Sequence, residues 1–586
     1  MDIKLKNILS DKYDNILNKY GFRKDSYEGD INLIIKNSIV AFLSDCSNPA
    51  IWCYGQHTKM LIADFVFEMK SIKYFIDEKY KYQKTEGFNI IGSEDIKKLE
   101  IDAIIISSFK YRREILDKIR TQFPDIKVLD IYESLKRQGI NLETEYYNGS
   151  HPYNLLQNLN RYIRNYIEVH NNDSAYRIEE LLLKIKDFRL ASKWACRFSK
   201  ELDNNWDEFY KDVTMLYQLQ LTAFGKIASS NVLMLCFDGL RQKDLSEGCM
   251  PNLKKYLQEN THYFTNAYSV STSTFESLIP AYGGYKDFTK EYYKDNIVKA
   301  GDCAFINEAI KQNRDIFFYT DSYRFVEEPV SVTNYSQLAT QKIWDFISDA
   351  LGTDNGLFYL HILYETHYSY PNPYTENRII ADGSNICFDF IERNGGKLRT
   401  DYIQQHMDAL RYIDDVIGSF LKRINFGVVF YADHGNVIYP TETRLEETRY
   451  TDYTFGQDLI RIPLAIKYAG SKNQLDEMSV CTDDRLVSLF SINDIVVSLL
   501  ADSRFRLLEN KYVKIQRTEL YNPNFQYLMK KLNYEKGLNS FECYIFDDGY
   551  KLVIYGDGSR ELYTLFDEQV EDACMMDEKL DYLHKK

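Results

Sequence analysis

The chain has 586 residues, more than one hydrophobic core usually serves, so roughly two to four domains are expected. Its hydrophobic content of 45% and charged content of 27% are those of a globular protein, and sparse glycine (27) and proline (11) argue against long flexible linkers. The net charge is −14 and no concentrated basic stripe occurs, which argues against a nucleic-acid partner.

The sequence shows no stretch typical of export or membrane insertion. Residues 1–17 lack the apolar core of a signal peptide, and no window approaches the ~20 apolar residues that span a bilayer. The ten cysteines are scattered without a CxxC pair, and some, such as Cys236, lie in apolar runs. These features predict reduced thiols in a cytoplasmic protein. Peripheral attachment to the inner face of the membrane is the alternative.

Residues 38–140 alternate between short apolar runs and amphipathic stretches. Strands are expected at IVAFL (39–43), AIWCYG (50–55), KYFIDE (73–78), DAIIISS (102–108) and IKVLDIY (126–132), and helices at TKMLIADFVFEMK (58–70) and REILDKIRTQF (113–123). The alternation predicts an α/β domain of residues 1–148, built on a parallel sheet covered by helices.

Gly55 and Asp77 are the candidate cofactor-binding residues of this domain. Gly55 lies in a strand-to-helix turn, where a helix N-terminus can hold a phosphate, and Asp77 ends the next strand, where an acid can bind a ribose. Only one glycine of a GxGxxG pattern is present, so a structural turn is an equal alternative. The layout resembles the small Rossmann-like domains of bacterial sugar- and polysaccharide-modifying enzymes. The resemblance implies nucleotide or sugar-nucleotide binding, or else a scaffold or dimerisation role in a homo-oligomer.

Residues 149–228 carry long amphipathic patterns such as LLQNLNRYIRNYIEV and predict a helical connector without a catalytic signal. From residue 229 to 586 the pattern is α/β again. In this third region two fully apolar runs, of the kind found in central parallel strands, end in acids. NVLMLCFDGLR (231–241) ends in Asp238, and GVVFYADHGN (427–436) ends in Asp433 and His434.

Acids at the carboxyl ends of parallel strands lie on the rim where α/β enzymes place their sites, although a lone aspartate there can also be a helix N-cap. Carboxylate oxygen and imidazole nitrogen are good ligands for zinc or manganese. A third apolar run, LFYLHILYETHYSYPNPY (357–374), contains His361, which we expect to be a satisfied core histidine. Just past it, Glu365 and His367 are candidates for contacting an anionic substrate, and His367 for acting as a general acid.

The hydroxyl-rich stretch STSTFESLIPAYGG (271–284) follows FTNAYS (264–269). Together with the acid-tipped strands, it resembles the alkaline phosphatase/sulfatase superfamily over residues ~230–575. Thr274 stands where sulfatases have the cysteine that becomes formylglycine, so sulfate-ester hydrolysis by that route is disfavoured. TST–x–x–S, with Thr274 and Ser277, is similar to lipid A phosphoethanolamine transferases. DGLR, ending in Arg241, is similar to nucleotide pyrophosphatase/phosphodiesterases.

Three further landmarks support the resemblance. YIQQHMDALRYIDDVIGSFL (402–421) resembles the helix before the Asp-His strand, RIPL (461–464) resembles the strand after it, and residues 549–572 resemble the hairpin near the end of sulfatase-like chains. The implied fold is a large sulfatase-like sandwich with a central mixed sheet.

The resemblance implies one metal site of Asp238, Thr274, Asp433 and His434. The bound cation would activate Thr274 as a nucleophile, with His367 contacting the transferred anion and Ser277, Arg241 and Glu365 binding substrate. The sequence lacks histidine between Gly435 and His584, whereas two-zinc relatives supply one there. We therefore expect one divalent cation, zinc ahead of manganese.

The leading functional hypothesis is a transferase that moves a substituted phosphoryl group, such as phosphoethanolamine or phosphoglycerol, onto a sugar of a bacterial surface glycan such as a capsule polysaccharide or its precursor. Its partners would be a phosphorylated, nucleotide-activated donor and a sugar acceptor. The alternative is a phosphodiesterase or phosphatase that uses the same threonine and passes the group to water. A sulfatase and a non-catalytic scaffold are the least favoured.

Overall fold

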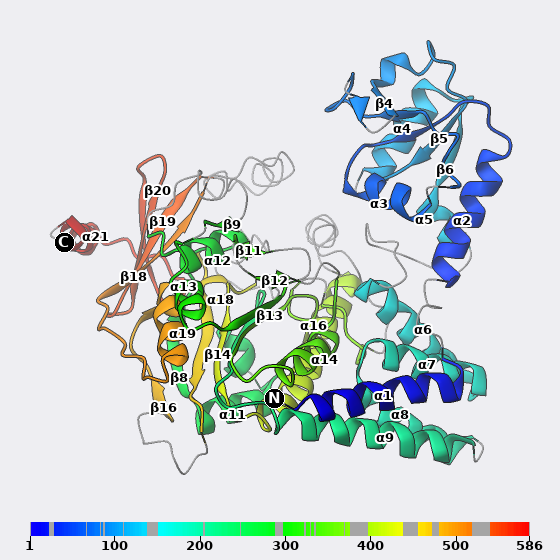
Figure 1. Cartoon of the computed structure of the whole chain (residues 1–586). Coiled ribbons are helices and arrows are strands. Elements are labelled where there is room, and N and C mark those ends of the chain that lie inside the picture. The colour runs from blue at the N-terminus through cyan, green and yellow to red at the C-terminus, as the bar shows by residue number, and fades with distance from the viewer. Residues whose placement is uncertain are drawn as a thin grey trace. The chain divides into compact units, whose positions relative to one another are not determined.

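A computed structural model gives the arrangement of the chain (Figure 1). It describes residues 2–584 except for 23–28, 66, 83, 86–87, 109–110, 138–150, 203–204, 247, 287–296, 300, 321–323, 328–329, 333–335, 368–369, 376–395, 437–454, 471–479 and 519–538. The chain divides into two compact units. The small unit contains Leu17–Val169, and the large unit combines Met1–Ile16 with most of the chain from His170 onward. The boundaries at 148/149 and 228/229 stay a prediction.

The small unit holds a sheet with the strand order β3-β4-β2-β1-β5-β6, parallel except for the short edge strand β3. The strands are β1 (Pro49–Trp52), β2 (Tyr74–Ile76), β3 (Lys84–Thr85), β4 (Phe88–Ile91), β5 (Ala103–Ile106) and β6 (Lys127–Asp130). Four described helices accompany them in the sequence: α2 (Gly29–Leu43), α3 (Gln56–Asp64), α4 (Arg112–Gln122) and α5 (Ile131–Arg137). This confirms the expected small α/β fold with a parallel sheet.

The strand predicted at residues 39–43 of this unit is wrong. Residues 39–43 form the last turn of helix α2. The five consecutive apolar residues hide a helical period, because Ile35 and Ile39, four residues apart, are fully buried while Val40 is 48% exposed.

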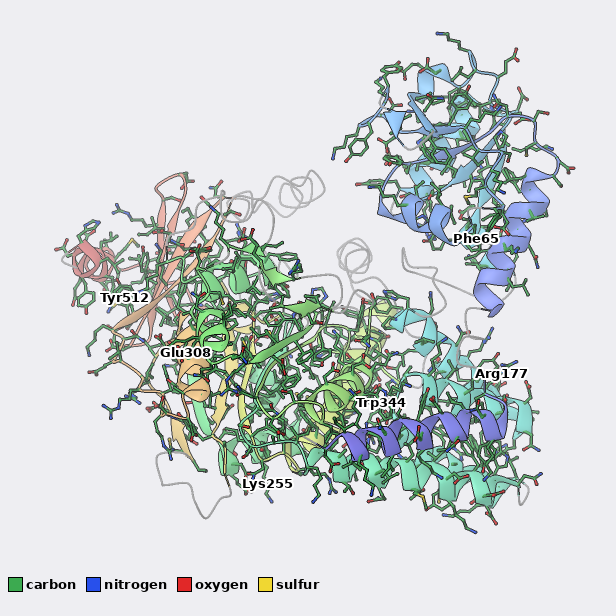
Figure 2. The ribbon with its side chains drawn as sticks, viewed as in Figure 1. Phe65, Arg177, Lys255, Glu308, Trp344 and Tyr512 are labelled. Atoms are coloured by element: carbon green, nitrogen blue, oxygen red, sulfur yellow. The ribbon has the colours of Figure 1, made fainter. Side chains whose placement is uncertain are left out.

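Helices fill residues 152–224: α6 (Pro152–Val169), α7 (Asn172–Lys184), α8 (Phe188–Glu201) and α9 (Asn205–Phe224). The starts of α7 and α8 are encoded locally, because the side chains of Asn171 and Asp187 accept hydrogen bonds from backbone N–H groups of the first turn. The first helix, α1 (Ile3–Tyr20), carries Tyr13 against Trp344 of α14 (Ala339–Ala350), the tryptophan labelled in Figure 2. Phe188 packs on the same indole. These aromatic contacts fasten the N-terminal helix to the large unit.

The large unit is built on a mixed sheet with the order β12-β10-β13-β7-β14-β15-β8-β16, and β17 also pairs with β8. The strands are β7 (Val232–Phe237), β8 (His262–Tyr268), β10 (Asp315–Tyr319), β12 (Ser331–Val332), β13 (Gly356–Ile362), β14 (Gly427–Ala432), β15 (Arg461–Lys467), β16 (Cys481–Asp483) and β17 (Val487–Ser488). The central strands β13, β7 and β14 are parallel and fully buried, which explains their unbroken apolar sequences.

Helices accompany this sheet: α10 (Gln242–Ser246), α11 (Pro251–Asn260), α12 (Thr274–Gly283), α13 (Ala304–Lys311), α16 (Gly396–Leu421), α18 (Gln457–Ile460) and α19 (Ile492–Leu500). A two-stranded sheet of β9 (Ile297–Val298) and β11 (Phe325–Val326) contacts α12. The expected helix at 402–421 and strand at 461–464 are confirmed by α16 and β15.

A separate antiparallel sheet closes the chain, with β18 (Tyr512–Arg517), β19 (Phe541–Phe546), β20 (Tyr550–Tyr555) and β21 (Arg560–Thr564), followed by α21 (Ala573–His584). The hairpin expected at 549–572 is β20–β21. Tyr268, at the end of β8, shares a hydrophobic cluster with Val513, Ile515 and Cys543 of this sheet. The C-terminal sheet is therefore packed directly on the segment that leads into α12.

Among the described helices, none combines the length and apolar character needed to cross a bilayer.

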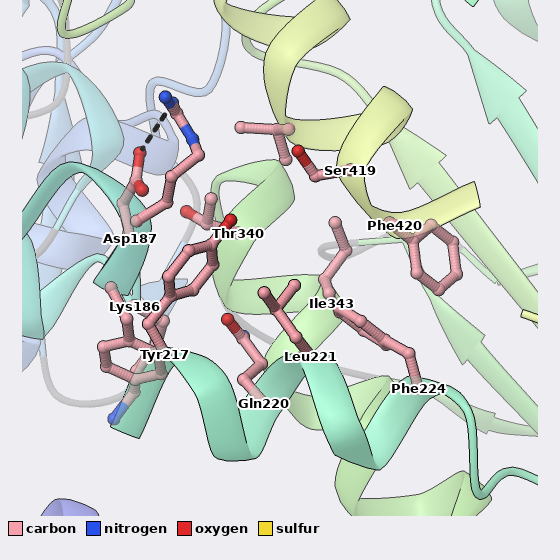
Figure 3. A pocket seen from close by; sticks show the side chains of 13 residues that line it. Lys186, Asp187, Tyr217, Gln220, Leu221, Phe224, Thr340, Ile343, Ser419 and Phe420 are labelled. Carbon is pink, nitrogen blue, oxygen red and sulfur yellow. Dashed lines mark ion pairs between the residues drawn. The ribbon is translucent and has the colours of Figure 1, made fainter. Parts of the chain in front are cut away.

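A cavity of about 40 Å³ lies between α8, α9, α14 and α16, where Asp187 and Arg189 form an ion pair at 3.7 Å (Figure 3). Ligand sites usually have hundreds of Å³, so this cavity suits a few water molecules and not a substrate.

Candidate active site

Three neighbouring strands of the large sheet bring polar side chains to one point at their carboxyl ends. Strand β7 lies between β13 and β14 and runs parallel to both, with His361 opposite Cys236. Asp238, just past β7, therefore lies beside His361 and beside Asp433, just past β14. The three residues are buried, and one ligand atom from each lies within 4.8 Å of the others.

Thr274 is delivered to the same point by the start of α12. The preceding residue, Ser273, has an extended backbone (φ −145°, ψ 157°) and makes no side-chain cap, so the helix begins at Thr274. The Thr274 hydroxyl donates to Asp238 Oδ2 at 3.1 Å, and its oxygen lies 3.3 Å from His434 Nε2. A nucleophile candidate thus points into the acidic cluster from a separate element.

The hydrogen bond of His434 defines its tautomer. Its Nδ1 lies 2.6 Å from the backbone oxygen of Gly435, and because a carbonyl can only accept, the proton is on Nδ1. The Nε2 lone pair then faces the cluster, 3.7 Å from Asp238 Oδ1 and 3.6 Å from Asp433 Oδ2. This orientation is typical of a metal-ligating histidine.

Backbone contacts fix Asp433. Its Oδ1 accepts the N–H groups of Gly239 at 3.0 Å and of His434 at 2.7 Å, which turns Oδ2 toward the cluster. Gly239 has φ +74°, a left-handed conformation that other residues rarely adopt. At Gly435, a Cβ would lie 2.0 Å from the backbone oxygen of Asp458. The glycines that follow the two site aspartates are therefore required by the geometry.

The electrostatics of the cluster favour a bound cation. Burial alone would raise the pKa of Asp238, but the neighbouring imidazoles of His367, His361 and His434 outweigh it and hold that pKa below its ordinary value. Burial and the Asp238 charge raise the pKa of Asp433. Two adjacent buried carboxylates are costly unless a positive charge joins them.

The hydrogen-bonding of these side chains is incomplete within the described part of the chain. Asp238 Oδ1, Asp433 Oδ2 and both ring nitrogens of His361 are buried without a hydrogen-bond partner. These orphaned atoms converge, and carboxylate, imidazole and hydroxyl donors fit a zinc or manganese ion. The residues present therefore fit the divalent metal that the sequence predicts.

The sequence of this region matches a known family. Residues 230–501 match the model of the Sulfatase family, and residues 47–128 match the family described as C2185-like, N-terminal. Residues 230–501 form a sulfatase-family domain. For this region the match confirms the predicted likeness to the alkaline phosphatase/sulfatase superfamily. A search of curated proteins found no match to the chain.

Solved structures similar to the chain include three enzymes of low identity. The phosphonate monoester hydrolase from Silicibacter pomeroyi is 12% identical, with 61% of this chain and 94% of that chain covered and a TM-score of 0.44. The lipoteichoic acid synthase from Listeria monocytogenes is 14% identical (61% and 90% covered, TM-score 0.38). The integral membrane lipooligosaccharide phosphoethanolamine transferase A from Neisseria meningitidis is 14% identical (56% and 70% covered, TM-score 0.35).

Arg241, expected to bind substrate, lies in a buried ion-pair network of the sulfatase-family domain. Its Nε and Nη2 donate to Asp244 Oδ1 at 3.0 and 2.5 Å, and its Nη1 donates to Asp458 Oδ2 at 2.8 Å. With 1% of the residue exposed, the geometry favours a structural role over the predicted substrate contact.

Ser277 and Glu365 are likewise held by protein contacts. The Ser277 hydroxyl lies 3.0 Å from that of Ser269, which donates to the backbone oxygen of Asp433. Glu365 Oε1 accepts the N–H of Ala339, the first residue of α14, at 2.7 Å. Both side chains are fully buried, so these contacts support neighbouring elements, and a substrate contact by either stays a prediction.

His361 departs from its expected role. It is a core residue, as expected, but it is not satisfied: its Nε2 lies 3.4 Å from Asp238 Oδ2 without a hydrogen bond. The sequence did not reveal this because the pairing of β13 with β7 is needed to bring His361 to Asp238. His367 lies at the mouth of the same cluster, its Nε2 3.8 Å from Asp238 Oδ1 and its side chain 23% exposed.

In the small unit, Gly55 is the N-cap of α3 and gives no side-chain cap, as expected for a strand-to-helix turn. Asp77 Oδ2 accepts the N–H of Tyr54, and its Oδ1 accepts the N–H groups of Lys79 and Tyr80, at 2.9 to 3.2 Å. Both carboxylate oxygens of Asp77 thus accept hydrogen bonds from backbone N–H groups near the carboxyl ends of β1 and β2. Ligand binding by Gly55 and Asp77 stays a prediction.

Proposed function

We propose that the protein is a metal-dependent transferase that moves a substituted phosphoryl group, such as phosphoethanolamine or phosphoglycerol, through a phosphothreonine at Thr274. The acceptor in this proposal is a sugar of a bacterial surface glycan or its precursor. The observation that carries the proposal is the Thr274 hydroxyl, 3.1 Å from Asp238 and 3.3 Å from His434 at a helix start. The family match supports an enzyme with a phosphoryl- or sulfuryl-type substrate.

In the proposed first step, Thr274 Oγ1 bonds to phosphorus and the bond from phosphorus to the leaving oxygen breaks. The Thr274 proton passes to the Asp238 carboxylate, its hydrogen-bond acceptor. His367, a partly exposed histidine beside Asp238, donates a proton to the departing oxygen and later removes one from the acceptor hydroxyl. In the second step the acceptor oxygen bonds to phosphorus, the bond from phosphorus to Thr274 Oγ1 breaks, and Asp238 returns the proton to Thr274 Oγ1.

The start of α12 also favours this chemistry. Thr274 is the first residue of this helix, and a helix N-terminus stabilises negative charge. One divalent cation, zinc in preference to manganese, would be held by Asp238, Asp433, His434, Thr274 and His361. When bound, a divalent ion lowers the pKa of a ligating hydroxyl and neutralises charge on phosphoryl oxygens.

The donor in this proposal is nucleotide-activated, and we propose separately that the Gly55 turn of the small unit binds a nucleotide phosphate. We propose the cytoplasm as the site of action, because the cysteines are scattered along the sequence without a CxxC pair and some, such as Cys236, lie in the buried core.

The test is incubation of the full chain and zinc or manganese with phosphoethanolamine and phosphoglycerol donors, lipid-linked and nucleotide-activated, with and without a sugar acceptor. Mass spectrometry of the peptide carrying Thr274 should show the added group, Thr274→Ala should lack it, and Thr274→Ser should retain it. Product that forms only with acceptor supports the transferase. Free headgroup phosphate released without acceptor supports the phosphodiesterase alternative. A Thr274→Ala protein with full turnover would overturn both.

A further inference from the structure

The segment that precedes Thr274, residues 269–273, is held by contacts outside the metal-binding cluster. We refer to it as the nucleophile loop. The Ser269 hydroxyl donates to the backbone oxygen of Asp433, and the Val270 oxygen accepts the N–H of Gln516 at 2.9 Å. The Ser271 hydroxyl donates to Glu276 Oε2 at 3.0 Å. The loop is thus fixed to β14, to β18 and to the first turn of α12.

Glu276 joins two of these attachments. Besides the Ser271 hydroxyl, its carboxylate accepts the Thr518 hydroxyl at Oε1 and lies 3.4 Å from the Thr518 N–H at Oε2. Thr518 directly follows β18, so this contact joins residues 242 positions apart in the sequence. One carboxylate therefore connects the nucleophile loop, the nucleophile helix and the C-terminal sheet.

Glu276 faces away from the chemistry. Residues two apart on a helix are about 200° apart around its axis, so Glu276 and Thr274 lie on opposite sides of α12. The Thr274 hydroxyl contacts Asp238 and His434, whereas the Glu276 carboxylate contacts hydroxyls and an amide of the loop and of Thr518. Those donors occupy its acceptor positions, which suits an orienting group better than a base.

The geometry points to Glu276 as a positioning residue that holds Thr274 in line with the metal-binding cluster, with Thr518 of the C-terminal sheet as its anchor. The inference rests on the proposed function for the role of Thr274, and it adds a requirement for a sheet that lies outside the matched family residues 230–501. A displacement of about 1 Å at a reacting group can cost about 100-fold in rate, so such an anchor has a large effect on catalysis.

The contacts of Tyr268 extend the same attachment. This residue ends β8, immediately before the nucleophile loop, and is buried in the cluster that contains Val513 and Ile515 of β18. Hydrophobic packing sets the approach of the two elements, and the Glu276–Thr518 contact then fixes the rotation of the first helical turn. A loss of the polar contact alone should leave the packing, and hence the fold, intact.

The experiment compares full-length Glu276→Ala, Glu276→Gln, Thr518→Val and the Glu276→Ala/Thr518→Val double variant with the unsubstituted chain. Glu259→Ala is the matched control, because Glu259 is an exposed glutamate of α11, the helix that carries Lys255 in Figure 2. Two quantities are measured on each protein. One is hydrogen–deuterium exchange of the peptide covering residues 269–276. The other is the rate of phosphothreonine formation with a nucleotide-activated phosphoethanolamine donor, separated into kcat and KM.

We expect Glu276→Ala and Thr518→Val each to raise exchange of the 269–276 peptide at least about 10-fold and to lower kcat about 10- to 100-fold, with KM changed less than about 3-fold. The double variant should show no faster exchange and no lower kcat than the more affected single variant, because both substitutions remove the same Glu276–Thr518 contact. Glu276→Gln should recover most of the rate, because the amide oxygen still accepts, and Glu259→Ala should change neither quantity.

Unchanged exchange in the two single variants would overturn the inference, whatever the activity. Raised exchange with unchanged kcat would also overturn it, because the contact would then order the loop without positioning the nucleophile. Absence of phosphothreonine in the unsubstituted protein would instead defeat the proposed function, and the exchange measurement would still decide whether Glu276 holds the loop.

Discussion

At the scale of single residues, His361 is the side chain whose role depends most on its surroundings. It is fully buried, and its Nε2 lies 3.4 Å from Asp238 Oδ2. We predict that His361→Gln lowers the affinity for zinc about 10- to 100-fold, because an imidazole that faces the two carboxylates would be lost. Isothermal titration of the metal-stripped chain measures this directly, without a substrate.

The matched control is His262→Gln. His262 begins β8, at the end of the strand remote from the nucleophile loop, and its Nε2 lies 3.0 Å from Asp483 Oδ2. Its substitution should leave zinc affinity unchanged. An equal affinity in the His361 and His262 variants would show that His361 is only a core residue.

Tyr370 links two parts of the candidate site. It has φ +57° and is 1% exposed, its ring lies 4.5 Å from that of His406, and its hydroxyl accepts a hydrogen bond from Asn436 Nδ2. Tyr370 is three residues past His367, and Asn436 is two past His434. We predict that Tyr370→Phe leaves a buried donor without its acceptor, lowers the free energy of unfolding by about 1–3 kcal/mol and lowers kcat several-fold.

Urea unfolding and steady-state kinetics check the two effects separately. Tyr374→Phe is the comparison, since the Tyr374 hydroxyl donates to Asp415 on α16 and does not contact Asn436. It should lower stability without a comparable loss of kcat. Full turnover in the Tyr370→Phe protein would show that the link between the two segments does not serve catalysis.

At the scale of elements, Asn493 in the first turn of α19 holds two other helices. Its Nδ2 donates to the backbone oxygens of Ala281 and Tyr282 at 2.8 Å, near the end of α12, and its Oδ1 accepts the N–H of Phe305 in α13 at 3.3 Å. We predict that Asn493→Leu lowers the free energy of unfolding by about 2–5 kcal/mol, because three buried backbone groups lose their partner. Chemical denaturation measures the change. The exposed neighbour, Asp494→Ala, should cost less than about 0.5 kcal/mol.

The elements that carry the site follow from local sequence. Unbroken apolar runs predict buried parallel strands, and an acid at the end of each predicts a polar rim, as observed for Asp238 and Asp433. The start of α12 at Thr274 is also marked by its hydroxyl-rich loop. These features were predictable because they depend on neighbours in the sequence.

Features that depend on strand pairing were not predictable. His361 reaches Asp238 only through the register of β13 on β7, and Glu365 contacts the start of α14 only through tertiary packing. The run at 39–43 has the composition of a strand, yet it lies in α2 because Ile35 and Ile39 pack together on one helical face. Helix α1 was also missed, since its apolar residues are spaced among many lysines and aspartates.

At the scale of the whole molecule, some contacts to the nucleophile loop come from outside the matched Sulfatase residues. The match ends at residue 501, whereas Gln516 and Thr518, at the end of β18, contact Val270 and Glu276. Tyr268 is buried against the same sheet. The C-terminal sheet therefore completes the nucleophile loop, and a chain cut at 501 should lose the order of that loop.

The core of the small unit contains a buried histidine, His57. His57 is 8% exposed, with Nδ1 2.8 Å from the Ser107 hydroxyl and Nε2 2.7 Å from the Tyr132 hydroxyl. Burial lowers the pKa of His57 from 6.5 to about 4. An unfolded chain therefore binds a proton at His57 between pH 6.5 and 4 that the folded chain does not. The stability contributed by the neutral imidazole is fully present above pH 6.5 and is lost as the pH falls toward 4.

We predict that the small unit loses about 3 kcal/mol of stability from this group between pH 7 and pH 4, since one pKa unit corresponds to about 1.4 kcal/mol. Hydrogen exchange of amides in β1 and β5, corrected for intrinsic rates, measures local unfolding in the full chain at pH 7 and pH 5. In His57→Gln the pH dependence should shrink by about 2 kcal/mol over that interval. His170→Gln, at a side chain 50% exposed, should leave it unchanged. A buried imidazole with a depressed pKa must contribute to the pH dependence of stability in this window. If stability depends on pH equally in His57→Gln and in the unsubstituted chain, the prediction is wrong and other groups control the acid response.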